Sequence, residues 1–537
     1  MSTRIPVKSK LIVSRWRELL VDYHDSSICD LLEFGFPVDY SSSVLPHVLE
    51  YRNHRGALSH ADEVTDYLKK ECVKGRMAGP FDCIPLDSLM VSPLNTVPKA
   101  DSDERRVLVD LSWPPGSSVN DGIIKGFYLG QSFTLNFPTV DNICALLVQV
   151  GPGAHIYKRD LAQAYRQFPV DPKDFNLLGY FWQGQYYVDS VLAMGQRSSA
   201  LCCQRATGAV IHIHNSKGFP SLVYLDDFFG VSPPDVSAVA FKALGDLFTY
   251  LGLSEKQSKA VPPTTCATVL GILFDTNAMT MSVTPARLEE ITSLLSIWLD
   301  KKKASKREIQ QLLGKLSFVS KCVRQSRIFL NRLFAALRSL RRDHHRIDLS
   351  SDFRKDLIWW MTFVKVYNGV SVIPPNLFSE PDHILQSDAC LTGCGAICGS
   401  AYFHAKFPTS ILALDLDINC LELLTVVVSI KLWGHFWRNL NIQIYCDNMT
   451  AVLAINSGAS RSGFIASCLR ELWFWCAKYE ILLRACHLPG VENRISDWLS
   501  RWHLDPSFYS DKFFNAVSGD ITEVVLLDKY FMNDYTN

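Results

Sequence analysis

The sequence predicts a multidomain protein of the α+β and α/β classes, and three observations support this fold class. The chain has 537 residues, 48% of them apolar, so it is too long for one ordinary core and apolar enough to fill several. Short apolar runs alternate with turn residues and helical stretches between residues 98 and 225, and this mixed pattern returns beyond residue 384. Between these two regions, helical periodicity alone persists from residue 284 to about residue 366.

These changes of pattern divide the chain into segments. Thr284-Pro285 is typical of a helix start, and Pro374-Pro375 with the polar residues after it is typical of a linker. Ser59 is predicted to cap a helix that runs through Leu68. We expect an N-terminal segment of unknown role (1–45), a first mixed α and β region (46–278), a helical region (279–375), a second α/β region (382–504) and a C-terminal tail (505–537).

The charge of the chain is balanced overall and uneven locally. Lys and Arg together number 54, as do Asp and Glu, which argues against a tail held to nucleic acid by charge alone. Between Lys301 and Arg346, however, fourteen basic residues stand against Glu308 and Asp343 only. We expect this stretch to form helices that lie along a phosphate backbone.

The cysteines and the apolar runs indicate the setting of the protein. Sixteen cysteines in a long chain without a signal peptide favour free thiols in a reduced, intracellular compartment, cytoplasm or nucleus. The longest apolar stretch, residues 421–437, is interrupted by Glu422, Lys431 and His435 and is a poor membrane span. We therefore expect no membrane partner.

A first group of carboxylates follows strand-like runs in the region 46–278. Residues 221–225 and 228–231 are largely apolar, and Asp226-Asp227 joins them in a tight turn. An isolated acidic pair of this kind is often only a solvated turn, but Asp160 ends another strand-like run, residues 154–159. Three carboxylates from two strand ends can hold two Mg²⁺ ions for phosphoryl transfer.

These residues carry a family resemblance. Tyr224-Leu-Asp-Asp227 resembles the catalytic box of reverse transcriptases, and Asp160-Leu-Ala-Gln-Ala-Tyr165 resembles their first metal motif. Residues 194–204, Met-Gly-Gln-Arg-Ser-Ser-Ala-Leu-Cys-Cys-Gln, resemble the loop and helix that brace the template and the incoming nucleotide. The resemblance implies fingers and palm for residues 46–278, and a thumb or connection for residues 279–375.

The same resemblance implies roles for individual residues. Asp160 and Asp226 would hold the metals, with Asp227 completing the acidic site. The nucleotide would be bound by Lys99 and Arg106 at its phosphates, by Tyr165 beneath its sugar and by the loop at Gly195. Either Lys256 or Lys259 would protonate pyrophosphate, and we favour Lys259.

Some positions depart from the retroviral pattern. Met194, Ala200 and Ser112 stand where Gln or Phe, Pro and a second Arg are usual. Residues 107–122, Val-Leu-Val-Asp-Leu-Ser-Trp-Pro-Pro-Gly-Ser-Ser-Val-Asn-Asp-Gly, are similar instead to polymerases of DIRS-like, tyrosine-recombinase retrotransposons. Solvated basic residues and a core aromatic are the plain alternatives for Lys99, Arg106 and Tyr165.

A second group of carboxylates lies in the region 382–504. Asp388 and Asp447 each end a strand-like run, and Asn448 is placed to cap the helix that follows. Glu422 lies on a helix that is apolar nearly all round, so it must be buried, and Asp497 lies near the start of a later helix.

In this order, the four carboxylates resemble the metal ligands of type 1 ribonuclease H. His487, ten residues before Asp497, corresponds to the mobile histidine that assists product release in that family. The resemblance implies catalytic roles for Asp388, Glu422, Asp447, His487 and Asp497. The plain alternatives are helix caps for Asp447 and Asp497, and a surface loop for His487.

A zinc site is a competing interpretation of the cysteines in this region. Cys390, Cys394 and Cys398 are evenly spaced, with His404 nearby. The spacing is wrong for a zinc ribbon, and residues four apart on a strand share a face. We expect buried thiols beneath the long helix and assign no zinc.

The sequence therefore predicts a retrotransposon reverse transcriptase, a right-hand polymerase of fingers, palm and thumb, joined to a ribonuclease H-like α/β domain. We expect two Mg²⁺ ions in each active site, with Mn²⁺ as a substitute. The expected partners are an RNA template, a DNA primer, an RNA-DNA hybrid, deoxynucleoside triphosphates, and recombinase and Gag-like proteins of the same element. The alternative is a domesticated nucleic-acid-binding derivative that keeps the fold without turnover.

Overall fold

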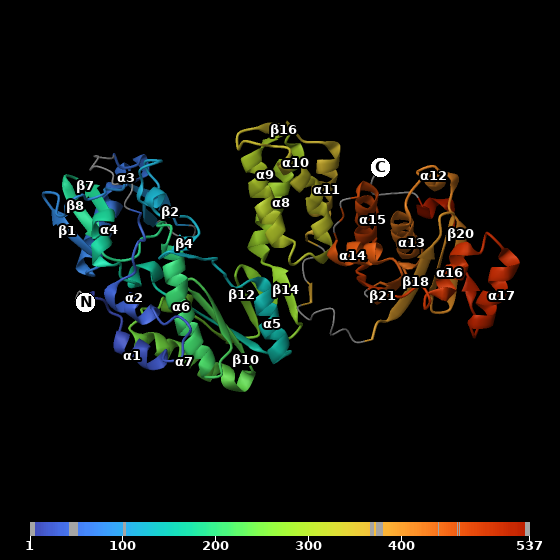
Figure 1. The fold of residues 1–537 in the computed structure, drawn as a ribbon, viewed down its shortest axis with the longest axis horizontal. Coiled ribbons are helices and arrows are strands. Elements are labelled where there is room, and N and C mark those ends of the chain that lie inside the picture. Colours follow the sequence, from blue (N-terminus) through green and yellow to red (C-terminus); the bar gives the residue numbers. More distant parts are fainter. Residues whose placement is uncertain are drawn as a thin grey trace. The chain divides into compact units, whose positions relative to one another are not determined.

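The computed structural model describes residues 6–41, 52–99, 104–365, 370–371, 380–438, 440–458, 460 and 462–531. The chain forms two compact units, Met1–Val269 with Asp275–Asn277, and Leu270–Phe274 with Ala278–Asn537 (Figure 1). Both units combine helices and sheets, so the predicted mixed α and β multidomain class is confirmed. The linker predicted at Pro374-Pro375 and the boundary at residue 45 lie outside the described residues. Within the described ranges, no helix has the length and apolar character needed to cross a membrane.

The first unit contains several small sheets and the helices that cover them. Its helices are α1 (Val13–Leu19), α2 (Ile28–Phe34), α3 (Arg55–Leu58), α4 (Ala61–Val73), α5 (Val140–Val150), α6 (Ser199–Ser216) and α7 (Pro234–Leu251). Its strands are β1 (Met77–Phe81), β2 (Leu94–Pro98), β3 (Arg105–Val109), β4 (Phe127–Tyr128), β5 (Gln131–Ser132), β6 (His155–Asp160), β7 (Gly179–Trp182), β8 (Gln185–Asp189), β9 (Ser221–Tyr224), β10 (Asp227–Ser232), β11 (Val261–Thr264) and β12 (Cys266–Val269). The short 3₁₀ helices include η1 (Val119–Gly122), η2 (Ala164–Gln167) and η4 (Gln257–Lys259).

An antiparallel sheet in the order β11-β6-β10-β9 positions the first group of carboxylates. Strand β10 is buried from Phe228 to Ser232, because helices α5 and α7 pack against it. Helix α6 packs against β9. Phe228 meets Phe248 of α7 edge to face, with ring centroids 4.8 Å apart, which is typical of a close-packed core.

The N-terminal segment, to which the sequence assigned no role, packs against this unit. Trp16 is fully buried, and its indole N–H donates to the carbonyl of Leu251 at the end of α7, at 3.0 Å. Asp25 forms an ion pair with Arg205 of α6, at 2.8 Å. Residues 6–41 are therefore part of the core of the first unit.

One predicted helix start is wrong. The helix begins at Ala61, its N-cap is His60, and no side chain caps it. Ser59 instead ends the separate short helix α3, and its backbone N–H donates to the carbonyl of Arg55. The physical reason is that α3 packs against β2, a tertiary contact that local capping rules do not contain.

The second unit contains a helical region followed by a larger sheet. Its helices are α8 (Pro285–Asp300), α9 (Lys306–Val319), α10 (Asn331–Arg338), α11 (Ser351–Phe363), α12 (Thr409–Leu412), α13 (Ile418–Trp433), α14 (Met449–Ser457), α15 (Gly463–Tyr479), α16 (Arg494–Arg501) and α17 (Pro506–Ala516). Its strands are β13 (Ile272–Asp275), β14 (Thr280–Val283), β15 (Lys303–Ser305), β16 (Arg346–Asp348), β17 (Val370–Ser371), β18 (His383–Ala389), β19 (Gly393–Cys398), β20 (Ala401–Lys406), β21 (Asn441–Cys446), β22 (Leu482–His487) and β23 (Thr522–Glu523).

The larger sheet has the order β22-β21-β18-β19-β20-β23. Strands β22, β21 and β18 are parallel, so their carboxyl ends meet at one edge, whereas β18, β19 and β20 form an antiparallel meander. Helix α13 packs on β18 and β19 and is buried from Cys420 to Trp433, as its sequence, apolar nearly all round, predicts. Helix α16 packs on the same two strands (Figure 1).

Candidate active sites

Asp160, Asp226 and Asp227 lie together at one end of the sheet of the first unit. Asp160 is the last residue of β6 and is paired directly with Asp227, the first residue of β10. Asp226 lies in the turn between β9 and β10, and its carbonyl accepts the N–H of Leu161 at 3.0 Å. Backbone pairing therefore joins the turn to the end of β6 and brings all three residues to the same place.

The electrostatics of this cluster are those of carboxylates that repel each other. Burial raises the pKa of Asp226, and the charge of Asp160 raises it further. Burial also raises the pKa of Asp227, against the effect of Lys158, whose Nζ lies 3.2 Å from Asp227 Oδ2. A set of oxygen ligands with these properties suits a hard divalent cation.

Of the two lysines left open by the sequence, Lys259 is the one whose side chain contacts the cluster. Its Nζ lies 3.0 Å from Asp160 Oδ2, and this hydrogen bond raises the pKa of Lys259. Lys256 contributes its backbone N–H, which donates to the carbonyl of Asp160 at 2.7 Å.

The other predicted nucleotide-binding residues differ in how directly they interact with the carboxylates. Tyr165, in η2, packs against the core, and burial raises its pKa, to which the charge of Asp226 also contributes. Arg106, on the β2–β3 hairpin, lowers the pKa of Asp226 through its charge. Lys99, on the same hairpin, is paired with Glu104.

Gly195 lies in the exposed loop before α6, with φ of +98°, a conformation that favours glycine. Its carbonyl accepts a hydrogen bond from the side-chain amide of Asn120, at 2.9 Å. The described contacts connect Gly195 to Asn120 and connect none of its atoms to the carboxylates.

Sequence reasoning missed Lys158, Gln167 and Gln204, which support the cluster. Gln167 donates to the carbonyls of Ala162 and Ser254 at 2.8 and 2.9 Å, and thereby joins the chain after Asp160 to the loop that carries Lys259. The signal available in the sequence was position, because Lys158 and Gln204 lie inside the segments 154–159 and 194–204, and Gln167 lies two residues beyond the motif of residues 160–165.

The second group of carboxylates lies at the edge where the parallel strands end. Asp388 lies on β18, and Asp447 directly follows β21, the parallel neighbour of β18. Glu422 reaches this edge from α13, where its Oε1 accepts the N–H of Ala389 at 3.1 Å. Cys446 Sγ lies 3.5 Å from Glu422 Oε2.

Asp497 and His487 complete this group. Asp497, on α16, pairs with Arg501 at 2.7 Å, and its charge raises the pKa of Asp388. His487 ends β22, and its Nε2 lies 3.1 Å from the carbonyl of Asp447. All five residues predicted for this site therefore lie around one edge of the sheet.

Burial controls the ionisation of this group. It raises the pKa of Glu422 to about 9, and the charge of Asp388 adds to the effect. Burial likewise raises the pKa of Asp388 to about 7, opposed by the Ser500 hydroxyl, which donates to Asp388 Oδ2 at 2.6 Å. Ligand atoms of Glu422, Cys446 and Asp447 lie within 4.8 Å of one another, so the donor set fits a divalent cation.

The plain alternatives for Asp447 and Asp497 are not supported. The cap of α14 is Asn448, as predicted, whose side chain accepts the N–H of Ala451 at 2.9 Å. The N-cap of α16 is Asn493. Neither aspartate is therefore needed to begin a helix.

The cysteines of the competing zinc interpretation lie among packed helices and strands. Cys394 and Cys398 are buried on β19, and α13 packs on this strand. Burial raises the pKa of the Cys394 thiol, which also contacts Thr425 of α13. His404 forms an ion pair with Glu523, at 3.2 Å.

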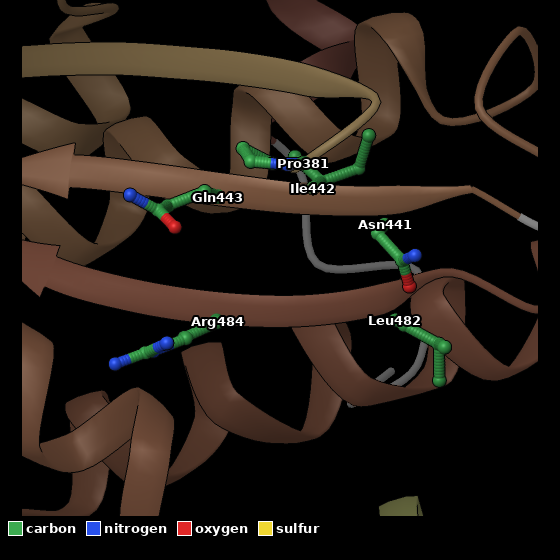
Figure 2. Close-up of a pocket in the computed structure, with 6 residues that line it drawn as sticks. All are labelled: Pro381, Asn441, Ile442, Gln443, Leu482 and Arg484. Atoms are coloured by element: carbon green, nitrogen blue, oxygen red, sulfur yellow. The ribbon is translucent and has the colours of Figure 1, made fainter. Parts of the chain in front are cut away.

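A hollow in the second unit lies away from the carboxylates. It is at the start of β21 and β22, whereas Asp447 follows the end of β21. Figure 2 shows the residues that line it: Pro381, Asn441, Ile442, Gln443, Leu482 and Arg484.

Comparison with known proteins identifies the class of fold. No protein-family model matches the chain, and no curated protein matches it. A foamy viral protease-reverse transcriptase dRH, solved in complex with double-stranded DNA, is similar in structure with a TM-score of 0.51 and 13% identity, over 90% of this chain and 83% of that chain. A foamy viral protease-reverse transcriptase with double-stranded DNA has a TM-score of 0.49 and 14% identity, over 90% and 99%. The chain thus has a reverse transcriptase-like fold.

Proposed function

We propose that this chain is an RNA-directed DNA polymerase that also carries type 1 ribonuclease H activity. The observation that carries the proposal is that two sets of carboxylates, distant in the sequence, each converge at strand ends in a different compact unit. The similarity of residues 107–122 to DIRS-like polymerases supports an origin in a retrotransposon.

In the proposed polymerase site, Asp160 and Asp226 hold Mg²⁺, for which Mn²⁺ can substitute, and Asp227 completes the acidic site. The bound ions would activate the primer 3′-hydroxyl and stabilise the pyrophosphate leaving group. Lys259, held at Asp160, is placed to give a proton to pyrophosphate.

Residues around this site bind the nucleotide. Arg106 and Lys99 on the β2–β3 hairpin neutralise its phosphates, and the backbone at Gly195 approaches it closely. Tyr165 presents an aromatic ring that excludes a ribose 2′-hydroxyl, so deoxynucleoside triphosphates are selected.

In the proposed ribonuclease H site, Asp388, Glu422, Asp447 and Asp497 hold the ions that would activate water against the RNA strand of an RNA-DNA hybrid. His487 is exposed and lies beside Asp447, which suits a role in product release. The choice of RNA rests on the 2′-hydroxyl and the minor-groove shape of the hybrid.

The proposed partners follow from these activities: an RNA template, a DNA primer and, from the same element, recombinase and Gag-like proteins, in the cytoplasm or nucleus. Exposed Lys302, Lys303 and Lys321 and the exposed run Arg341–Arg342 provide positive charge for a phosphate backbone. A binding protein without turnover is not favoured, because it would gain nothing from buried carboxylates that repel each other.

Primer extension tests the proposed function. The full chain should extend a DNA primer on an RNA template in Mg²⁺ and cleave the RNA of a preformed hybrid. Chelation of the metal should stop both reactions. If the purified, folded chain shows neither reaction in Mg²⁺ or Mn²⁺, the proposed function is wrong.

A further inference from the structure

The turn that carries Asp226 has an unusual backbone that a neighbouring helix holds in place. Leu225, the first residue of the turn, has φ of +55°, in the left-handed region that a branched residue rarely adopts. Such a conformation persists only where the surroundings determine it. Helix α6 supplies the contact, through the side chain of Gln204.

Gln204 holds the edge of β9 with both ends of its amide. Its Oε1 accepts the N–H of Leu225 at 2.8 Å, and its Nε2 donates to the carbonyl of Val223 at 3.0 Å. These two backbone groups lie on either side of Tyr224, so a single side chain fixes the strand end and the start of the turn. An amide has both a donor and an acceptor, whereas a methionine of similar length has no donor and only a weakly accepting sulfur, and a carboxylate accepts only.

The other side of the turn is fixed by the metal motif itself. The carbonyl of Asp226 accepts the N–H of Leu161, the residue after Asp160. Asp226 is therefore held between Gln204, which acts through Leu225, and the end of β6. We propose that Gln204 is a positioning residue that sets Asp226 relative to Asp160, an inference that rests on the proposed role of these aspartates in the first site.

The same helix contains a matched control. Asn215 lies near the other end of α6 and holds the other end of β9, where its Oδ1 accepts the N–H of Ser221 at 2.9 Å and its Nδ2 donates to the carbonyl of Ser221 at 3.2 Å. Both amides therefore make a pair of bonds to the backbone of the same strand, and Asn215 Oδ1 also accepts the Ser221 hydroxyl at 2.9 Å. Of these two amides, Gln204 is the one that contacts the turn. Substitution of Asn215 therefore removes hydrogen bonds to β9, whereas substitution of Gln204 also removes the contact that positions Asp226.

The experiment compares Gln204→Met with Asn215→Leu in the full chain. We expect both to lower the melting temperature by similar amounts. Gln204→Met should lower kcat for primer extension by about 10- to 100-fold, because a shift of about 1 Å in a reacting group has an effect of this size. It should also raise the Mg²⁺ concentration for half-maximal rate, with little change in KM for the nucleotide. Asn215→Leu should leave kcat and Mg²⁺ dependence within about twofold of the unsubstituted chain.

A binding measurement separates this inference from the proposed function. Mn²⁺ binding is followed by electron paramagnetic resonance in chains that carry Asp388→Asn and Asp447→Asn, which remove the second site. Gln204→Met should weaken the remaining binding severalfold, and Asn215→Leu should not. A chain that extends no primer contradicts the proposed function, while the Mn²⁺ comparison still decides the role of Gln204. Equal Mn²⁺ affinity in both variants, or no binding that depends on Asp226, would overturn the inference.

Discussion

The two carboxylate clusters manage their negative charge differently. In the first, Lys158 lies against Asp227 and Lys259 against Asp160, so the chain itself supplies two positive groups. In the second, Glu422 and Asp388 are only 2% and 4% exposed, and the groups that contact them are backbone N–H, a thiol and a hydroxyl. The chain also supplies Arg501 to the second cluster, where it pairs with Asp497 at 2.7 Å. The first cluster is therefore largely neutralised by its lysines, whereas Glu422 and Asp388 of the second must bind protons or a cation.

This difference indicates how each site is prepared for its metal. A cluster with lysines nearby stays ionised and accepts a cation by displacing or sharing those lysines. A buried cluster without them holds a proton until a cation replaces it, so metal binding releases protons.

The largest expected effect is the separation of the two activities by single amide substitutions. Asp226→Asn should lower DNA synthesis by at least about 100-fold and leave cleavage of a preformed RNA-DNA hybrid within a few-fold of normal, and Asp447→Asn should do the reverse. An amide keeps the shape of the carboxylate and removes its charge, so the damage should stay local. Single-turnover assays on the two substrates make this measurement.

Folding provides the control for these variants. Relief of carboxylate repulsion should leave each variant folded, with a melting temperature in metal-free buffer equal to or slightly above that of the unsubstituted chain. If Asp447→Asn still degrades the hybrid at the normal rate in Mg²⁺, with contaminating nuclease excluded, the ribonuclease H assignment fails.

The next effect is the pH dependence of stability in the second unit. The pKa of Glu422 is about 9 in the folded chain, against an ordinary value of 4.5, so the folded chain binds the proton more tightly than the unfolded chain. This stabilisation is complete below about pH 4.5 and is lost as the pH rises toward 9. In chelator, the melting temperature of the second unit should fall by roughly 5 to 10 °C between pH 6 and pH 9.

Glu422→Gln and Mg²⁺ test the cause of this pH dependence. The substitution removes the titrating group and should flatten the profile, and saturating Mg²⁺ should restore stability at high pH because it binds the ionised form. Calorimetry with the two unfolding transitions resolved makes the measurement. A profile that is equally steep in Glu422→Gln assigns the effect to other groups.

A smaller effect is expected on the choice of sugar in the first site. Tyr165→Ala should raise ribonucleotide incorporation, relative to deoxynucleotide incorporation, by roughly 10- to 100-fold, because the ring no longer blocks a 2′-hydroxyl. Single-nucleotide extension with matched ribo- and deoxynucleotides measures the ratio. Unchanged discrimination would leave Tyr165 as a core aromatic only.

Local patterns in the sequence predicted the elements that carry the carboxylates. The strand that ends at Asp160, the hairpin around Asp226, the buried helix of Glu422 and the cap at Asn448 all follow from periodicity, burial and capping, and the structure confirms these elements. Such features depend on neighbours within a few residues, which is why one sequence was sufficient.

The remaining features depend on partners distant in the sequence. Trp16 forms a hydrogen bond with Leu251, and Gln204 forms one with Leu225; no local pattern in the sequence connects these residues. The start of the helix predicted at Ser59 was wrong for the same reason, since a tertiary contact of α3 decides where α4 begins, while the helix through Leu68 is present. Periodicity gives the face of an element and does not identify what that face contacts.

The smallest expected effect concerns the basic stretch between Lys301 and Arg346, where the structure sharpens the expectation that these charges track a duplex. Lys315 is paired with Glu290 at 2.7 Å, whereas Lys321 is exposed, and the side chain of Arg324 lies outside the described residues. A lysine already paired releases fewer counterions when it meets a phosphate. Lys321→Gln should therefore reduce the log-log salt slope of primer-template binding by roughly 0.9, and Lys315→Gln by less than half of that.

Fluorescence anisotropy between 50 and 300 mM salt measures both slopes, with Lys242→Gln on α7, outside the basic stretch, as the control. An unchanged slope for Lys321→Gln would mean that this charge is only solvated, and that the second unit contacts nucleic acid through other groups.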